Sequence, residues 1–164
     1  AMNGLQMVGA IGAMLLAFIA LIAMVNGMLE AGGAWVGIEQ LTLERVLGGL
    51  LQPLAWALGI PWDEAQLAGS LIGQKFILNE FVAYVTFSEV AAQLSPHSQA
   101  IVIFALCGFA NLSSIAILLG GLGAVAPGRR DDISRYGFRA LFAASLSNLM
   151  SAALAGFFLT LGAA

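Results

Sequence analysis

The sequence predicts an all-α, polytopic membrane protein. Hydrophobic residues make up 60% of the 164 residues, charged residues only 9%, and the mean hydropathy is +0.95. A typical soluble domain has about 25% charged residues. Because backbone groups in lipid must be paired internally, such a chain forms helices or a closed barrel, and its long apolar runs without alternation favour helices.

The first predicted element is a membrane-spanning helix over Leu5–Leu29. This run is long enough to cross about 30 Å of hydrocarbon, and it is too long for a secretory signal. Polar and small residues over 30–45 predict an interfacial turn. The next run, Leu43–Gly59, is apolar but short and contains Pro53, which favours a helix at the membrane surface over a kinked span.

The segment Trp62–Gln93 is predicted to be a re-entrant helical hairpin. Pro61, Asp63 and Glu64 form a credible helix start, because proline fits the first turn and the helix dipole favours acidic residues there. If the chain turns near Asn79, the two arms have about 16 and 13 residues and reach only about 20 to 24 Å. Neither arm would cross about 30 Å of hydrocarbon, so a re-entrant hairpin fits better than two spans.

A helix that breaks in its middle is predicted next. Ser95 is a plausible cap for its start, and Pro96 fits the first turn. The apolar run continues to Val125, and Pro127 ends it. Its middle carries a cluster of small and polar residues, namely Gly108, Asn111, Ser113 and Ser114. Such residues help to unwind a helix and to expose backbone groups to a ligand.

A basic loop and a last span complete the prediction. Residues 128–139 hold four of the six basic residues, namely Arg129, Arg130, Arg135 and Arg139. The positive-inside rule therefore places this loop in the cytoplasm. The last transmembrane helix, 140–162, then runs outward, and the hairpin enters from the external side.

The sequence lacks the signatures of nucleic-acid-binding proteins, metalloproteins and enzymes. The net charge is −3 and no basic stripe is present, so nucleic acid is not an expected partner. The single histidine, His97, makes a metal site improbable. No catalytic triad pattern, phosphate-binding loop or pair of catalytic carboxylates is present, so we expect neither an enzyme nor a cofactor. Cys107 is predicted to be a packed core residue.

Glu80 is the first candidate for a functional role. A carboxylate inside a membrane costs roughly 2.5 to 3.5 kcal/mol on insertion scales, so it needs a polar cavity, a partner or a proton. A purely structural alternative pairs Glu80 with Lys75 or with a buried helix end, and Lys75 could instead snorkel to a headgroup. Asn111 and Ser114 face the same way on a nearly helical segment and could bind one small polar ligand.

Polar side chains also hold transmembrane helices together, and for Asn111 and Ser114 packing and ligand binding are about equally good explanations. For the cluster on the last span, packing is favoured; this cluster comprises Ser145, Ser147, Asn148 and Ser151.

Two motifs resemble the concentrative nucleoside transporter family. The first has Gly-Gln-Lys at 73–75 and Asn-Glu-Phe-Val-Ala-Tyr at 79–84, and the second is Ala-Leu-Cys-Gly-Phe-Ala-Asn at 105–111. Ala-Pro at 126–127 and Arg-Ala-Leu at 139–141 extend the match over essentially the whole chain. One departure is Leu112, at a position where phenylalanine is common in the family.

This resemblance implies the carboxy-terminal half of a cation-coupled nucleoside symporter, so we expect a fragment of a longer protein. Residues 1–60 would form a scaffold transmembrane helix and an external interfacial helix. Residues 61–164 would form half of the transport domain. Its parts would be the re-entrant hairpin 61–94, the broken helix 95–127, the cytoplasmic loop 128–139 and the last transmembrane helix 140–162.

The resemblance also implies a substrate site and partners. Glu80, Asn111 and Ser114 would bind the ribose hydroxyls, with Phe109 beside the sugar. The coupling cation would be sodium or a proton, bound mainly by the missing amino-terminal half, which also holds the nucleobase-binding hairpin. Homotrimers in the cell membrane, for a bacterium the inner membrane, and an elevator-type mechanism would follow. The alternative is a noncatalytic membrane subunit whose polar residues pack helices.

Overall fold

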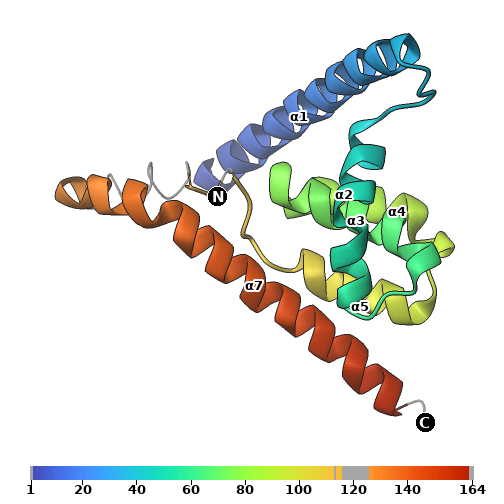
Figure 1. The fold of residues 1–164 in the computed structure, drawn as a ribbon. Helices are drawn as coiled ribbons and strands as arrows, with labels where there is room; N and C mark the ends of the chain where they lie inside the picture. The colour runs from blue at the N-terminus through green and yellow to red at the C-terminus, as the bar shows by residue number, and fades with distance from the viewer. Residues whose placement is uncertain (1, 113, 116–125, 163–164) are drawn as a thin grey trace. The chain divides into compact units, whose positions relative to one another are not determined.

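The computed structural model describes residues 2–112, 114–115 and 126–162. In these residues the regular secondary structure is helical throughout, as Figure 1 shows, which confirms the all-α prediction. The chain divides into two compact units, Ala1–Val46 and Leu47–Ala164. Each unit is described by itself.

The first unit contains α1 (Met2–Trp35) and the first turn of α2 (Leu43–Ala57). The predicted turn over 30–45 is wrong at its start, because α1 continues to Trp35. No proline stops the helix there, and the chain turns back only after Trp35. A Cβ atom on Gly33 would lie 2.6 Å from the Ile38 carbonyl oxygen, so glycine is the residue that lets the returning chain approach α1.

Asn26 connects α1 to the start of α2. Its amide nitrogen donates to the Glu44 carboxylate at 3.0 Å, and its oxygen accepts from the Leu43 N–H at 2.7 Å. The Arg45 N–H donates to the Thr42 hydroxyl at 3.2 Å. Thr42 therefore caps the start of α2, and the polar Asn26 satisfies a helix end that would otherwise lack partners.

In the second unit, the remainder of α2 packs closely against α3 (Trp62–Ile77). A Cβ atom on Gly69 would lie 2.9 Å from the backbone of Leu51, and one on Gly48 would lie 2.7 Å from the Gln66 carbonyl. Gly59 ends α2 in the left-handed region, with φ of 102°. By these contacts, most of α2 packs with α3 in one compact unit. The predicted boundary between scaffold and transport domain lies later, at residue 60.

The hairpin consists of α3 and α4 (Glu80–Val90), with Leu78 and Asn79 between them. The arms have 16 and 11 residues, close to the predicted lengths. A short 3-10 turn, Ala91–Gln93, follows α4. The arms are joined by the buried Gln74, whose side-chain oxygen accepts from the Thr86 hydroxyl at 2.9 Å.

The next helix is interrupted where the small and polar cluster lies. Helix α5 (Pro96–Leu106) begins with Ser95 as its cap. Residues 107–111 are not helical, and helical conformation resumes at residues 112, 114 and 115. Residues 116–125 of the predicted broken helix lie outside the described residues. Figure 1 shows α5 beside α7, and the buried core includes Ile101 and Val102 of α5 together with Leu149 and Ala152 of α7.

Helix α7 (Arg130–Gly162) follows a 3-10 turn at Pro127–Arg129. The prediction of a loop over 128–139 is therefore wrong from Arg130 onward. Asp131 and Asp132 lie in the first turn of α7, where the helix dipole favours acidic side chains, and no proline follows Pro127. Charged residues mark the end of the apolar span but do not end the helix.

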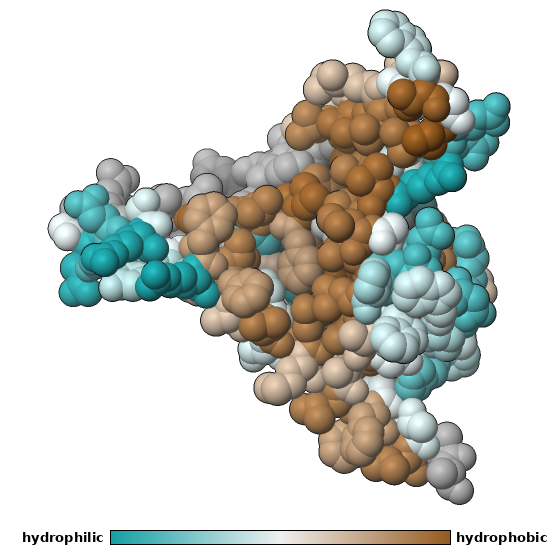
Figure 2. Space-filling view, in the orientation of Figure 1, coloured by the Kyte–Doolittle hydropathy of each residue, from teal (hydrophilic) through white to brown (hydrophobic). Residues whose placement is uncertain are grey.

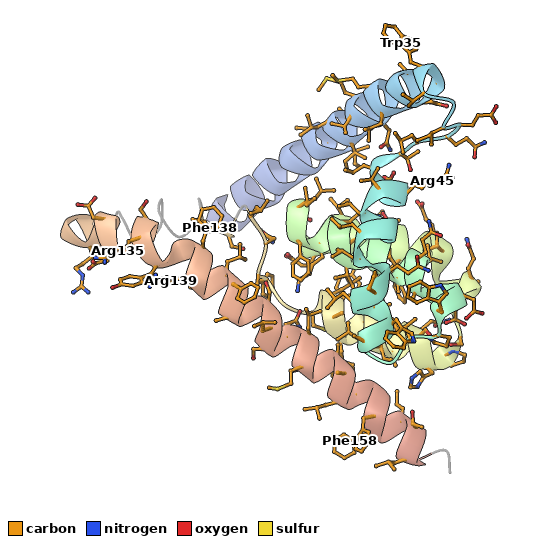
Figure 3. All side chains as sticks on the ribbon, in the orientation of Figure 1. Trp35, Arg45, Arg135, Phe138, Arg139 and Phe158 are labelled. Atoms are coloured by element: carbon orange, nitrogen blue, oxygen red, sulfur yellow. The ribbon has the colours of Figure 1, made fainter. Side chains whose placement is uncertain are left out.

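Among the described residues, one helical stretch, Ser134–Gly162, is long and apolar enough to cross a membrane. Figure 2 shows hydrophilic colour at the first turns of α7 and hydrophobic colour along its later turns. Figure 3 labels Arg135 and Arg139 near the first of these regions and Phe158 near the far end of the helix.

Candidate functional site

Glu80 is the first residue of α4, at the tip of the hairpin. Asn79 caps this helix, and its side-chain oxygen accepts from the Val82 N–H at 2.9 Å. The positive end of the helix dipole favours the carboxylate of Glu80 at this position. The hairpin tip therefore holds an acidic side chain, partly buried, at a fixed helix end.

Asn111 brings the interrupted helix to the hairpin tip. Its side-chain nitrogen donates to the Glu80 carboxylate at 3.1 Å, and Asn111 itself is only 4% exposed. The Asn111 side-chain oxygen accepts from the Ser114 N–H at 2.9 Å and lies 3.0 Å from the Ser114 hydroxyl. Three of the four predicted site residues therefore form one hydrogen-bonded cluster.

Phe109, the fourth predicted residue, joins this cluster through its backbone. Its carbonyl oxygen accepts from the Ser114 hydroxyl, while its ring is 77% exposed. Leu112, the departure from the family pattern, is 49% exposed. Both apolar residues are close to Asn111 in sequence, and the hydrogen bond between Glu80 and Asn111 forms in their presence.

The cluster has the chemistry to bind a vicinal diol. A carboxylate accepts hydrogen bonds, an amide both donates and accepts, and a hydroxyl does either. These three groups belong to Glu80, Asn111 and Ser114, and Asn111 lies within hydrogen-bond distance of the other two. Two adjacent hydroxyl groups of a ligand could replace the bond between Glu80 and Asn111 without leaving either side chain unpaired.

Lys75 does not play either of the roles that the sequence suggests. It is fully buried, so it does not snorkel, and no ion pair within 4.0 Å joins it to Glu80. Its ammonium group donates to the Ala105 carbonyl at 3.0 Å and to the Asn148 side-chain oxygen. Lys75 therefore contacts the end of α5 and the middle of α7.

Cys107 is exposed, so the prediction of a packed core residue is wrong. The helix ends at Leu106, and the chain beyond it no longer follows the buried face of α5. The Cys107 sulfur lies 3.2 Å from the Tyr84 hydroxyl, which donates to the Ile103 carbonyl at 2.9 Å. Sequence reasoning missed Tyr84, although its position four residues after Glu80 places both on one face of α4.

Asn148 was expected only to help pack helices, but its side chain makes hydrogen bonds to α3 and α5. Its side-chain nitrogen donates to the Phe104 carbonyl at 2.9 Å. The available signal was Gly108, where a Cβ atom would lie 2.7 Å from Asn148 Cγ. A glycine inside an apolar helical run indicates that another group approaches the backbone closely.

Comparison with known proteins supplies the family. The family described as "Na+ dependent nucleoside transporter C-terminus" matches residues 1–156. The chain is 48% identical to "Nucleoside permease NupC" of Helicobacter pylori over 168 residues, covering 99% of the chain and 40% of that protein. It is 35% identical to "Sodium/nucleoside cotransporter 1" of Homo sapiens, covering 92% of the chain and 26% of that protein.

A solved structure described as CNTnw in an inward-facing substrate-bound state is also similar. It matches with a TM-score of 0.95 and 56% identity, over 100% of this chain and 41% of that chain. Its likeness extends through the whole chain, and the chain spans about two fifths of the length of that structure and of the H. pylori permease. The names of these relatives describe transporters and permeases, and none of them describes an enzyme.

Proposed function

This chain belongs to the concentrative nucleoside transporter family and matches the carboxy-terminal part of its members, and we propose that the full-length protein is a cation-coupled nucleoside symporter. In this proposal the chain supplies the residues that bind the ribose. The observation that carries it is the hydrogen bond of 3.1 Å between Asn111 and Glu80, which joins the hairpin tip to the interrupted helix.

Ribose is the part of a nucleoside that fits these groups. Its 2′ and 3′ hydroxyls are adjacent, and each can donate one hydrogen bond and accept others. Glu80 accepts from one hydroxyl, and Asn111, oriented by its bonds to Ser114, donates to the other. Phe109, whose ring is exposed beside this cluster, packs against the apolar face of the sugar.

Membership of the family implies the rest of the mechanism, namely an elevator-type step in a homotrimer. Crossing the hydrocarbon with bare polar groups is unfavourable, so in such a step the substrate and its site move while covered by protein. The arginines at the start of α7 lie on the cytoplasmic side by the positive-inside rule, and α7 runs outward. For a bacterial protein, this multi-pass chain lies in the inner membrane.

Sodium or a proton is the co-substrate that drives uptake. The family description and the name of the human relative specify sodium. The amino-terminal part of the protein, which this chain does not include, would supply most of the cation ligands and the contacts to the nucleobase.

Uptake by site variants of the full-length protein tests the ribose assignment. We expect Glu80→Gln and Asn111→Ala to lower uptake of labelled uridine about 10- to 150-fold, since hydrogen bonds to charged groups contribute about 1.5 to 3 kcal/mol. The matched control is Glu89→Gln, an exposed acid on the same helix. Membrane insertion is measured in parallel by quantifying each variant in isolated membranes.

Normal uptake by both variants, at wild-type membrane levels, would contradict the site assignment. A wild-type protein with neither uridine uptake nor nucleoside-dependent thermal stabilisation would contradict transport itself and would favour a noncatalytic membrane subunit. Measuring wild-type uptake with and without a sodium gradient, and then with and without a proton gradient, identifies the coupling ion.

A further inference from the structure

The end of α5 is held by side chains from three other elements. In a regular α-helix the last four carbonyl groups have no partner within the helix. Here the three successive carbonyl oxygens of residues 103–105 each accept a hydrogen bond from elsewhere. The donors are Tyr84 of α4 at 2.9 Å, Asn148 of α7 at 2.9 Å and Lys75 of α3 at 3.0 Å. We call these three residues the helix-end clamp.

Lys75 is the most costly member of the helix-end clamp. Burying an ammonium group costs several kcal/mol unless it is paired and hydrogen-bonded, and Lys75 is fully buried. Its partners are the Ala105 carbonyl and the side-chain oxygen of Asn148. The negative end of the α5 dipole favours a cation at this place, so the end of the broken helix compensates for the burial.

The helix-end clamp depends on the interruption of the helix. The Ile103 carbonyl also accepts a helical bond from the Cys107 N–H at 3.1 Å, whereas a regular continuation of α5 would use the carbonyls of 104 and 105 for its own next turn. Gly108 also allows the approach of α7, since a Cβ atom there would lie 2.7 Å from Asn148 Cγ and Asn148 Oδ1. The bonds from Asn148 and Lys75 therefore take the place of two helical bonds that α5 no longer makes beyond Leu106.

From these contacts we infer that the helix-end clamp positions Asn111 for substrate. Residues 107–111 leave α5 at the carbonyls that the clamp holds and end at Asn111, which meets Glu80 across 3.1 Å. Two clamp residues come from the hairpin arms on either side of Glu80, so the clamp fixes both parts of the site at once. Lys75, Tyr84 and Asn148 are positioning residues: they act on the ligand through Asn111.

This inference rests on the proposed function, because its readout is nucleoside affinity. A role in folding alone would change how much protein reaches the membrane and leave the KM of that protein unchanged. A positioning role changes KM, because a misplaced Asn111 binds the ribose less well in every molecule that reaches the membrane. The split between KM and protein amount therefore separates the two roles.

The test is Lys75→Met in the full-length protein, which keeps the length of the buried stem and removes the cation. We expect the KM for uridine to rise at least about tenfold, because the Ala105 carbonyl and the Asn148 oxygen lose a charged donor. Uptake at saturating uridine, per molecule in the membrane, changes much less. The matched control is Ser151→Ala on α7, whose hydroxyl, among the residues that the structure describes, bonds to the Ser147 carbonyl of its own helix.

Tyr84→Phe keeps the inference testable if Lys75→Met fails to reach the membrane. It removes one hydroxyl donor and no charge, and we expect a KM several times that of the wild type. An unchanged KM in Lys75→Met, or in Tyr84→Phe where Lys75→Met does not insert, overturns the positioning role. Wild-type protein that takes up no nucleoside contradicts the proposed function instead, so the two failures are distinct.

Discussion

The interrupted helix and α7 carry similar polar clusters, but only the first of these helices is broken. Residues 108–114 combine glycine, asparagine and serines, and residues 145–151 combine serines and asparagine. Helix α5 ends at Leu106, just before the first of these regions, whereas α7 continues through the second without a break. Both segments lie in the same unit and share a buried core.

The difference lies in what neighbouring elements offer to the backbone. In α7, Ser151 bonds back to the Ser147 carbonyl of its own helix, which leaves the helical ladder intact. At the end of α5, donors from three other elements bond to the carbonyls of residues 103–105, and those of 104 and 105 would otherwise lack a partner. Small and polar residues therefore permit a break, and the break forms where other elements provide replacement hydrogen bonds.

Filling Gly108 is the strongest test of this contrast. In Gly108→Ala the new Cβ would lie 2.7 Å from Asn148 Cγ, so we expect a loss of about 1 to 3 kcal/mol of stability and about 5- to 150-fold weaker uridine binding. Thermal unfolding and uptake kinetics of the full-length protein measure both. Gly49→Ala in α2, with nothing within 4 Å of its Cβ position, should be neutral or slightly stabilising.

Equal behaviour of the Gly108 and Gly49 variants would mean that the close approach of Asn148 is not required for the break. In that case the small residues themselves, rather than the replacement donors, would distinguish α5 from α7.

Serine to alanine changes in the two clusters should differ by about 1 kcal/mol. Ser114→Ala removes the hydroxyl that contacts Asn111, through its N–H at 3.3 Å and its side-chain oxygen at 3.0 Å, so we expect the uridine KM to rise roughly threefold to tenfold. Ser147→Ala changes an exposed side chain of α7 and should leave KM unchanged. Comparable KM values in both variants would remove the functional distinction between the clusters.

The start of α5 is bonded to a carboxylate whose contribution to stability depends on pH. Near the start of α5, Glu64 accepts from the Ser95 N–H at 3.1 Å and from its hydroxyl at 3.0 Å. Desolvation acts to raise the pKa of Glu64, but hydrogen bonds from Ser98 and Ser95 together hold the pKa below its ordinary value.

A carboxyl whose pKa is lowered by folding stabilises the protein above its unfolded pKa, and this stability is lost as pH falls through its folded pKa. We therefore expect the wild type to lose more thermal stability on acidification than Glu64→Gln does. The difference is modest, because Glu64 is partly exposed to solvent. Melting temperatures of both proteins across the acidic range provide the measurement, and parallel curves would exclude a role for the charge.

The smallest effect is expected at the start of α7. Arg129 and Asp132 form an ion pair of 2.6 Å with side chains that are 75% and 50% exposed. Exposed pairs contribute between about 0 and 1 kcal/mol, so Asp132→Asn should change the free energy of unfolding by less than about 0.5 kcal/mol. A larger loss in thermal unfolding would show that the start of α7 depends on this contact.

Local signals in the sequence predicted most of the elements. Ser95 and Pro96 located the start of α5, and the arm lengths around Asn79 predicted a hairpin because they depend only on apolar runs and breakers. Helix ends without such signals were missed. Nothing in residues 30–35 or 130–139 stops a helix, so α1 and α7 extend beyond the apolar runs that the prediction followed.

The sequence pointed to the residues of the candidate site, but not to the residues that hold them in place. Glu80 and Asn111 stood out because polar groups are costly in an apolar segment, and the structure places them in contact. Tyr84 and Asn148 could not be assigned, since their roles arise from contacts between residues that lie far apart in sequence. Lys75 was noticed as a charge, yet its partners are a backbone carbonyl of α5 and the Asn148 side chain of α7, which no sequence pattern identifies.

The burial of Lys75 also makes this residue a chemical probe. It is the one lysine in the chain, so an acylating reagent has a single side-chain target here, and that target is shielded in the folded structure. Acylation at this position requires that the hairpin separate from α5 and α7. The rate at which the corresponding peptide gains mass in a labelling time course, followed by mass spectrometry, would therefore report how often the packed core of this half opens.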